Sequence, residues 1–411
     1  MTFTQKHTPT NKVEFVAIMA MLMSLVALSI DAILPALSLI GVDLGLESDA
    51  SHQTQLLLST IFIGMAFGLM IYGPLSDAYG RKKTIYLGLS IFLIGSIVSL
   101  VATDFNTMLI GRLIQGFGAA SCRVVSMALI RDKFEGQEMA KIMSLISAIF
   151  IVVPALAPSI GQLILFIANW QAIFVFVMAV SLLGVFLLHI RIPETLRLES
   201  RIQFSLKTIY KGIVETVTTS TTLAYMMASA LVFGSFIGYL ATSQPLLQVE
   251  YKLGDSFAFV FGLLSLAVGL SSLLNAKLLS KFSMEHLCIS SLTVLIITSG
   301  IFFTYSQSVV NNPSFYSALA YLAIVFFCFG ILFGNFNALA MKPLGHIAGT
   351  ASSTISSIQT LISTSIGITI GNMYDGSIVP LAISFLIVAT LSLIICLSIK
   401  FTSVSKLKFS H

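Results

Sequence analysis

Long apolar segments alternate with short polar ones along almost the whole chain. Each apolar segment has about 18 or more residues and few charges, enough for a helix to cross a lipid bilayer. The segments lie at residues 15–40, 53–75, 84–103, 106–130, 139–165, 169–190, 220–247, 255–276, 287–307, 315–338, 349–372 and 377–399. They lack the alternation of a membrane barrel, so the pattern predicts an all-α integral membrane protein with twelve spanning helices.

Composition supports this prediction. The chain is 56% hydrophobic and only 9% charged, which leaves too little polar surface for water. The first apolar segment contains Asp31 and Pro35 and shows no small-residue cleavage site, so we interpret it as a span and not as a cleaved signal peptide.

The basic residues predict the orientation of the chain. With the N-terminus in the cytoplasm, 19 of the 22 Lys and Arg fall on the cytoplasmic side, and only Lys252 falls on the other. Positive charge favours the inside, so both termini are expected in the cytoplasm. The same bias explains the net charge of +5, and we expect no nucleic-acid partner.

The longest polar stretch, residues 193–219, divides the spans six and six. We therefore expect an N-terminal bundle (residues 1–192), a cytoplasmic linker with some amphipathic helix (193–219) and a C-terminal bundle (220–411). Parallel halves of this kind suit alternating access around a binding site near the bilayer midplane.

A charged motif, Gly-Pro-Leu-Ser-Asp-Ala-Tyr-Gly-Arg-Lys-Lys, occupies residues 73–83 as a tight turn between two spans. It resembles the G-x-L-[S/A]-D-x-x-G-R-[K/R] loop of the major facilitator superfamily. The resemblance implies a transporter with the major facilitator fold, two bundles of six helices. It also implies a conformational latch made of Gly73, Asp77, Gly80 and Arg81, in which we expect Arg81 to pair with an acid of the N-terminal half.

Further motifs resemble the Bcr/CflA drug-resistance subfamily of drug:proton antiporters. They are Asp31-Ala-Ile-Leu-Pro-Ala-Leu37, Gly111-Arg-Leu-Ile-Gln-Gly-Phe-Gly-Ala-Ala120 and the antiporter-motif helix with Pro154, Pro158 and Gly161, where Gln162 replaces a usual glycine. The resemblance implies a proton-coupled exporter of small amphiphilic compounds in the bacterial cytoplasmic membrane. The alternative is an uptake or facilitative carrier for a specific metabolite or siderophore, in which Asp31 and Arg112 form a structural pair.

Three charged residues within the spans are the candidates for proton coupling and substrate binding. Asp31 is the one acid deep in a span, where an ionised carboxylate is costly, so we expect it to carry the coupled proton and to contact substrate. Arg112 lies at a depth where it can meet Asp31, either for proton coupling or as a permanent packing pair. Gln115 and Arg123 share the helical stripe of Arg112 and are expected to contact substrate. Two arginines and one acid favour neutral or anionic substrates, although Arg123 alternatively bonds helix carbonyls at an inner gate.

Other residues add less. Tyr239 and Asn337 are candidate substrate contacts in the C-terminal half, with interhelical hydrogen bonds as the alternative. The four cysteines lie in predicted spans without metal-ligand spacing, and no nucleotide motif is present, so we expect no cofactor, no use of ATP and no enzyme activity. The expected partners are a small-molecule substrate, protons and the lipid bilayer, and the protein is expected to act as a monomer.

Overall fold

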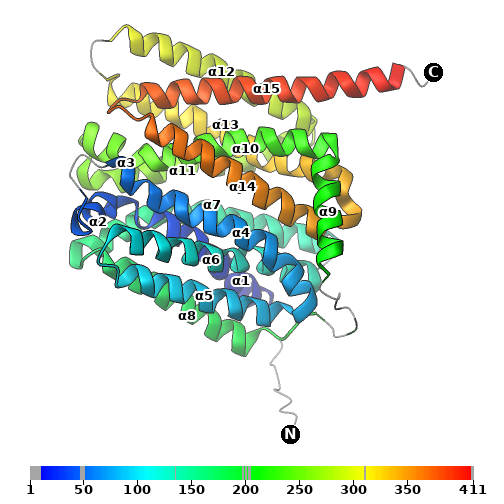
Figure 1. Cartoon of the computed structure of the whole chain (residues 1–411). Coiled ribbons are helices and arrows are strands. Elements are labelled where there is room, and N and C mark those ends of the chain that lie inside the picture. The colour runs from blue at the N-terminus through cyan, green and yellow to red at the C-terminus, as the bar shows by residue number, and fades with distance from the viewer. Residues whose placement is uncertain are drawn as a thin grey trace. The chain divides into compact units, whose positions relative to one another are not determined.

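The computed structural model describes residues 11–46, 51–134, 136–196, 199, 201, 205–309 and 312–408. The expected cytoplasmic ends, 1–10 and 409–411, lie outside this part. Within it the regular elements are all helices (Figure 1). The chain forms two compact units: one contains Met1–Ser48 and Thr60–Leu206, the other Asp49–Ser59 and Lys207–His411.

The N-terminal unit holds the first six spans. Its helices are α1 (Lys12–Asp31), η1 (Leu34–Ala36), α2 (Leu37–Asp43), nearly all of α4 (Leu56–Tyr79), α5 (Arg81–Leu100), α6 (Phe105–Lys133), α7 (Gly136–Ile167) and α8 (Gln171–Arg191).

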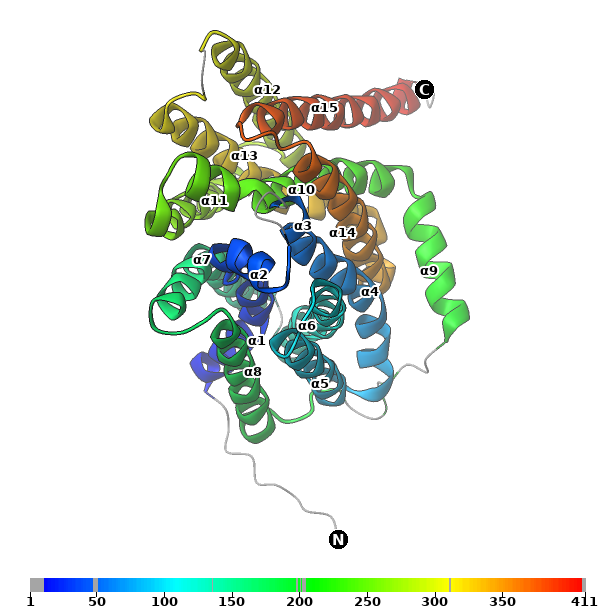
Figure 2. The ribbon, with the colours of Figure 1, turned by 60° about the vertical axis from the view of Figure 1, so that its left-hand side comes forward.

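The C-terminal unit holds the other six. Its helices are α3 (Ser51–Thr54), α9 (Leu206–Thr218), α10 (Ser220–Ser243), η3 (Gln244–Glu250), η4 (Gly254–Ser256), α11 (Phe257–Leu278), α12 (Met284–Gln307), α13 (Phe315–Met341), η5 (Lys342–Ile347), α14 (Ala348–Asn372) and α15 (Val379–Lys408). Figure 2 shows α14 running beside α10, which also packs against α13 and α15.

The helices match the predicted spans. Ten segments of the described chain are long and apolar enough to cross a membrane. One of them, Phe315–Asn372, contains both α13 and α14, and the apolar part of α7, Val152–Ile167, is additional. All twelve predicted spans therefore have a helical counterpart.

The first span is broken, although the sequence predicted one continuous segment. α1 ends at Asp31, and the chain continues through η1 into α2. Pro35 has no backbone N–H, so the carbonyl of Asp31, four residues earlier, loses its helical partner. The predicted proton carrier therefore lies at a break between two helical segments.

Helix α6 packs closely against its neighbours because it has glycines on two faces. A Cβ at Gly118 would lie 2.3 Å from the backbone nitrogen of Phe92 in α5. A Cβ at Gly116 would lie 2.0 Å from the carbonyl oxygen of Ile61 in α4. Small residues let membrane helices approach backbone to backbone, and this contact fixes the helix that carries Arg112 and Gln115.

Candidate functional site

The interior of the N-terminal unit contains a charged and polar cluster. Asp31 is 5% exposed, and Arg112 and Gln115 are 0% and 1% exposed. Buried charged groups are retained only where other polar atoms surround them, because the loss of water is costly.

Arg112 links three helices. Its Nη1 donates to the carbonyl oxygen of Ser29 in α1 at 2.8 Å and to Oε1 of Gln115 at 2.6 Å. The Gln115 amide in turn donates from Nε2 to Oγ of Ser96 in α5 at 2.9 Å. Ser29 is two residues before Asp31, so Arg112 lies against the turn of α1 that ends at the helix break. Both ends of the Gln115 amide are engaged within the unit.

The antiporter-motif helix packs against the same break. Pro154 and Pro158 lie inside α7, and Gly161 follows in the same helix. A Cβ at Gly161 would lie 1.9 Å from the carbonyl oxygen of Ala32, the residue after Asp31. The motif glycine therefore lies against the turn that follows Asp31.

The other candidate substrate contacts belong to α6 of the N-terminal unit and to α10 and α13 of the C-terminal unit. Arg123 is partly exposed on α6, three turns beyond Arg112. Tyr239 is fully buried, stacks on Phe261 with ring centroids 6.0 Å apart, and meets the edge of Phe326 at 4.7 Å. Asn337 is exposed on α13. Their roles toward substrate remain predictions.

Two other polar residues of the C-terminal unit pair with each other. Asn275 and Asn335 exchange amide hydrogen bonds of 3.1 and 2.9 Å between α11 and α13. These amide bonds join the two helices within the C-terminal unit.

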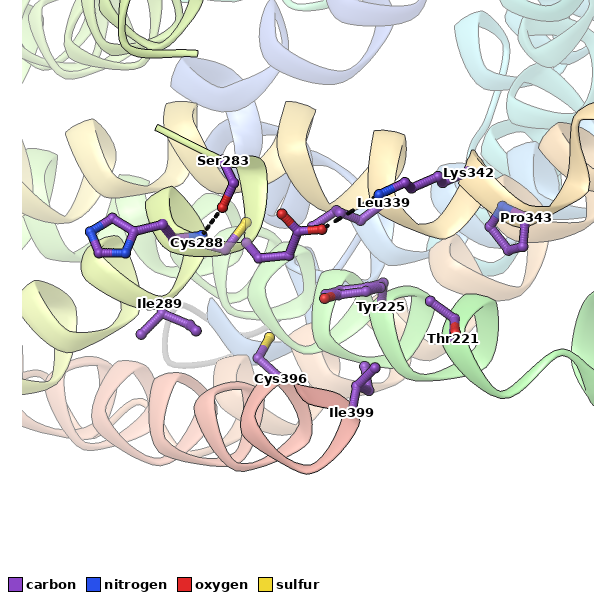
Figure 3. Close-up of a pocket in the computed structure, with 12 residues that line it drawn as sticks. Thr221, Tyr225, Ser283, Cys288, Ile289, Leu339, Lys342, Pro343, Cys396 and Ile399 are labelled. Carbon is purple, nitrogen blue, oxygen red and sulfur yellow. Dashed lines mark hydrogen bonds and ion pairs between the residues drawn. The ribbon is translucent and has the colours of Figure 1, made fainter. Parts of the chain in front are cut away.

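The C-terminal unit also contains a cavity of about 600 Å³ that the sequence did not indicate (Figure 3). Side chains from α10, α12, α13, η5 and α15 line it. Glu285 and Lys342 form an ion pair of 3.8 Å in its wall.

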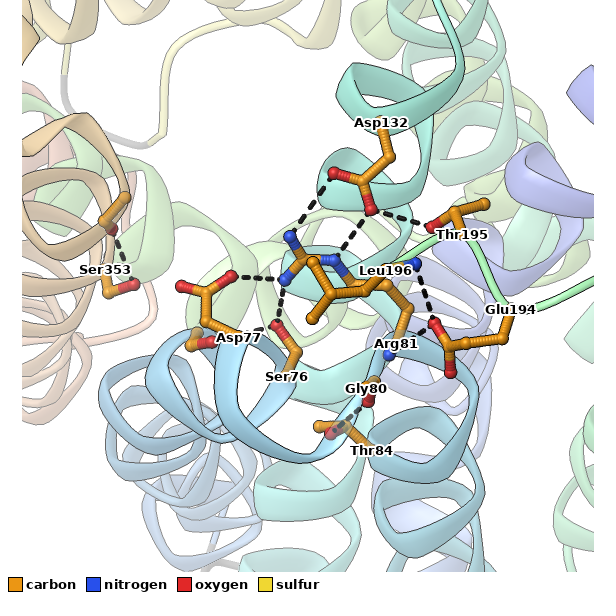
Figure 4. A network of polar contacts seen from close by, with 12 residues as sticks. Ser76, Asp77, Gly80, Arg81, Thr84, Asp132, Glu194, Thr195, Leu196 and Ser353 are labelled. Carbon is orange, nitrogen blue, oxygen red and sulfur yellow. Dashed lines mark hydrogen bonds and ion pairs between the residues drawn. The ribbon is translucent and has the colours of Figure 1, made fainter. Parts of the chain in front are cut away.

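Figure 4 shows the charged motif around Arg81. The sequence predicted a tight turn between two spans within residues 73–83, and the turn is shorter than the motif: α4 continues through Pro74 to Tyr79 and α5 begins at Arg81. Gly80 alone joins the helices, with a φ of 106° that glycine adopts without strain. A Cβ there would also lie 2.8 Å from Oε2 of Glu194.

Arg81 is the centre of this cluster. Its Nε and Nη2 donate to the two carboxylate oxygens of Asp132 at 2.9 and 3.3 Å, and its Nη1 donates to Asp77 and to Ser76. The expected pairing of Arg81 with an acid of the N-terminal half is confirmed. Such a fork-on-carboxylate geometry fixes direction as well as charge.

Glu194 and Thr195 tie the end of the N-terminal unit into the same cluster. The backbone N–H groups of Arg81 and Lys82 donate to the Glu194 carboxylate at 3.0 and 3.1 Å. The Thr195 hydroxyl donates to Asp132 at 2.7 Å. The first turn of α5 is thus held through backbone and side chain.

No cluster of His, Cys, Asp and Glu suited to a metal ion occurs among the residues that the structure describes. The polar groups described above interact through ion pairs and hydrogen bonds inside an apolar helical protein.

Ten described segments are long and apolar enough to cross a membrane, and the chain is an integral membrane protein. Residues 19–368 match the Major Facilitator Superfamily, and the chain belongs to that family. Solved structures agree on the fold: the chain is similar to the xylose transporter XylE from E. coli (TM-score 0.68, 15% identity, 94% of this chain and 96% of that one) and to the human organic anion transporter MFSD10 (TM-score 0.66, 16% identity, 94% and 98%).

Proteins with related sequences narrow the assignment within the superfamily. The chain is 28% identical to a bicyclomycin resistance protein homolog of Haemophilus influenzae, over 89% of this chain and 91% of the relative. It is 31% identical to the multidrug resistance protein MdtL of Citrobacter koseri, over 80% and 81%. It is 29% identical to the uncharacterized MFS-type transporter YdgK of Bacillus subtilis, over 89% and 90%. The resemblance to the Bcr/CflA drug-resistance subfamily is confirmed.

Proposed function

We propose that this transporter is a proton-coupled exporter that exchanges protons for small amphiphilic compounds, such as drugs or an endogenous metabolite. The observation that carries the proposal is the placement of Asp31, a buried acid at the break in the first span, beside the turn that Arg112 holds. A proton carrier needs an acid whose surroundings change during the cycle, and a helix break is a place where a small backbone movement changes them.

Arg112 is suited to stand beside a carboxyl that gains and loses a proton. Its bonds to the Ser29 carbonyl and the Gln115 amide use neutral acceptors, which keep their acceptor character when Asp31 is protonated. Neither of these two bonds is therefore lost when Asp31 changes its protonation state. The same bonds also favour a structural role for Arg112, which is the basis of the alternative function, an uptake or facilitative carrier.

The substrate class follows from charge. Asp31, Arg112 and Arg123 together carry one negative and two positive charges when the acid is ionised, which favours neutral or anionic compounds over lipophilic cations. Two relatives are named for resistance to bicyclomycin and to multiple drugs, which supports drugs among the compounds exported.

The proposal also includes the location of the protein and a conformational latch. We place the protein in the bacterial cytoplasmic membrane, as a monomer with both termini in the cytoplasm, because the basic residues follow the positive-inside rule. The Arg81 cluster, with Gly73, Asp77 and Gly80, then lies on the cytoplasmic face and acts as a latch during alternating access.

Transport into inverted membrane vesicles tests the proposal. With the vesicle lumen more acidic than the medium, so that protons leave the lumen, the vesicles should accumulate a neutral or anionic drug-like compound, and a protonophore should abolish the accumulation. A facilitative carrier would equilibrate the compound without concentrating it. Accumulation in right-side-out vesicles when the outside is acidified would instead establish proton-driven uptake.

A further inference from the structure

The cavity in the C-terminal unit lies at one end of its helices. α12 begins at Met284 and α13 ends at Met341, and both ends border the cavity with Ser283 and Lys342. Thr221 contributes from the first turn of α10. In a membrane protein, the end of a helix bundle is where the hydrocarbon gives way to lipid headgroups.

The lining changes from polar to apolar along the helices. Ser283, Glu285 and His286 lie in or beside the first turn of α12, and Lys342 follows the end of α13. Cys288 and Ile289 lie deeper along α12, and Leu339 one turn earlier on α13, with Cys396 and Ile399 from α15. Figure 3 shows Tyr225, Cys288, Ile289 and Cys396 around one space. An amphiphile in a bilayer has the same gradient, a polar head at the interface and an apolar chain within.

The two charges at the mouth are of opposite sign and remain accessible. The side chains of Glu285 and Lys342 are 39% and 67% exposed, and the atoms that join them are 3.8 Å apart. An exposed pair at this distance contributes little to stability, so each charge is available to a ligand group of opposite sign.

We propose that this cavity binds a zwitterionic amphiphile from the surrounding bilayer. Its ammonium group would meet Glu285, its acidic group would meet Lys342, and an acyl chain would lie against Ile289 and Leu339. The volume of about 600 Å³ lies within the range of small-molecule sites and is enough for a headgroup and the first part of one chain. This site is independent of the transport proposal, because it uses none of the residues assigned there.

The test is retention of lipid by the purified full-length protein. The protein in detergent is given equal amounts of a phosphatidylethanolamine and a phosphatidylglycerol with the same chains, and bound lipid is counted by native mass spectrometry. Wild type should retain the zwitterionic lipid about threefold better, the ratio that an exposed ion pair of roughly 0.7 kcal/mol gives. Glu285→Gln should remove most of this preference, because only the zwitterionic headgroup carries an ammonium.

Two tryptophan variants on α12 separate the cavity from the outer surface. Ile289→Trp fills the cavity and should abolish retention, whereas Ile301→Trp, at a position 64% exposed on the same helix, should leave it unchanged. Equal retention by these two variants, or equal retention of both lipids by wild type, would overturn the proposal. Displacement of the lipid by a transported compound would assign the cavity to substrate instead. Thermal melting shows whether a tryptophan variant has failed to fold. In that case the lipid preference of the conservative variant Glu285→Gln still tests the proposal.

Discussion

The Cα of Gly161 lies so close to the carbonyl of Ala32 that a methyl group on it would come within 1.9 Å of the oxygen. This contact joins α7 to the residue after Asp31, at the point where the first span is broken. The antiporter-motif helix and the predicted proton carrier are therefore mechanically connected within one unit.

Gly161→Ala should push α7 away from the break. We expect a loss of stability on the order of 1–3 kcal/mol, the usual result of overpacking, seen as a lower melting temperature, together with slower transport. Gly300→Ala is the matched control, because nothing lies within 4 Å of the Cβ it would add to α12. That variant should be neutral or stabilised by up to about 1 kcal/mol from helix propensity. Equal effects of the two substitutions would show that the contact is unimportant.

Asp31→Asn should separate binding from proton coupling. The amide is close to the carboxyl in size and cannot give up a proton to water, so the variant should fold and bind substrate but lose proton-driven accumulation in inverted vesicles. Asp104→Asn is the control, since Asp104 caps the start of α6 at an exposed position where asparagine caps equally well. Full proton exchange by Asp31→Asn would exclude Asp31 as the carrier.

The Arg81 cluster should govern the rate of the cycle and not the affinity. Asp77→Asn and Arg81→Ala each remove a charge from the bonds that hold the first turn of α5, so transport should slow while substrate affinity stays nearly constant. Parallel measurements of initial transport rate and of equilibrium binding distinguish the two effects.

A control for this prediction is the ion pair of Arg191 with Glu14, joined at 2.9 Å but partly exposed. Arg191→Ala should change stability by less than about 1 kcal/mol and leave the transport rate near that of wild type. If Arg81→Ala instead lowers affinity alone by about tenfold, equivalent to about 1.4 kcal/mol, the cluster belongs to a binding site and the latch is wrong.

The sequence predicted the spans well because lipid requires every spanning segment to be long, apolar and helical. It also identified Arg81 as a residue needing an acidic partner. It did not identify Asp132 as that partner, 51 positions away, because the choice depends on how α5 and α6 pack.

The interior site was predicted less completely. Asp31 and Arg112 were found because charges are conspicuous in an apolar segment. The bonds of Arg112 to Ser29 and Gln115 depend on a backbone carbonyl and a rotamer, which no residue pattern specifies. Pro35 marked the break after Asp31 in retrospect, but proline also occurs in continuous spans, as Pro154 and Pro158 do in α7.

Arg123 is partly exposed on α6, eleven residues beyond Arg112. A charge on a spanning helix is costly to maintain, so it is expected to have a function. We expect it to attract or orient electronegative substrates.

Arg123→Ala should weaken binding of neutral and anionic compounds and relatively spare cationic ones, because it removes a positive charge that attracts the former and repels the latter. Arg123→Lys should restore the attraction but not the two-pronged hydrogen bonding of a guanidinium. Lys133→Ala is the control, a cation of the same helix whose Nζ lies 4.3 Å from the centre of the Phe15 ring. It should not discriminate between substrates by charge. The measurement is the dissociation constant for each member of a panel of cationic, neutral and anionic compounds. Equal losses of affinity across the panel for Arg123→Ala would favour a gate or packing role, because neither role distinguishes substrates by charge.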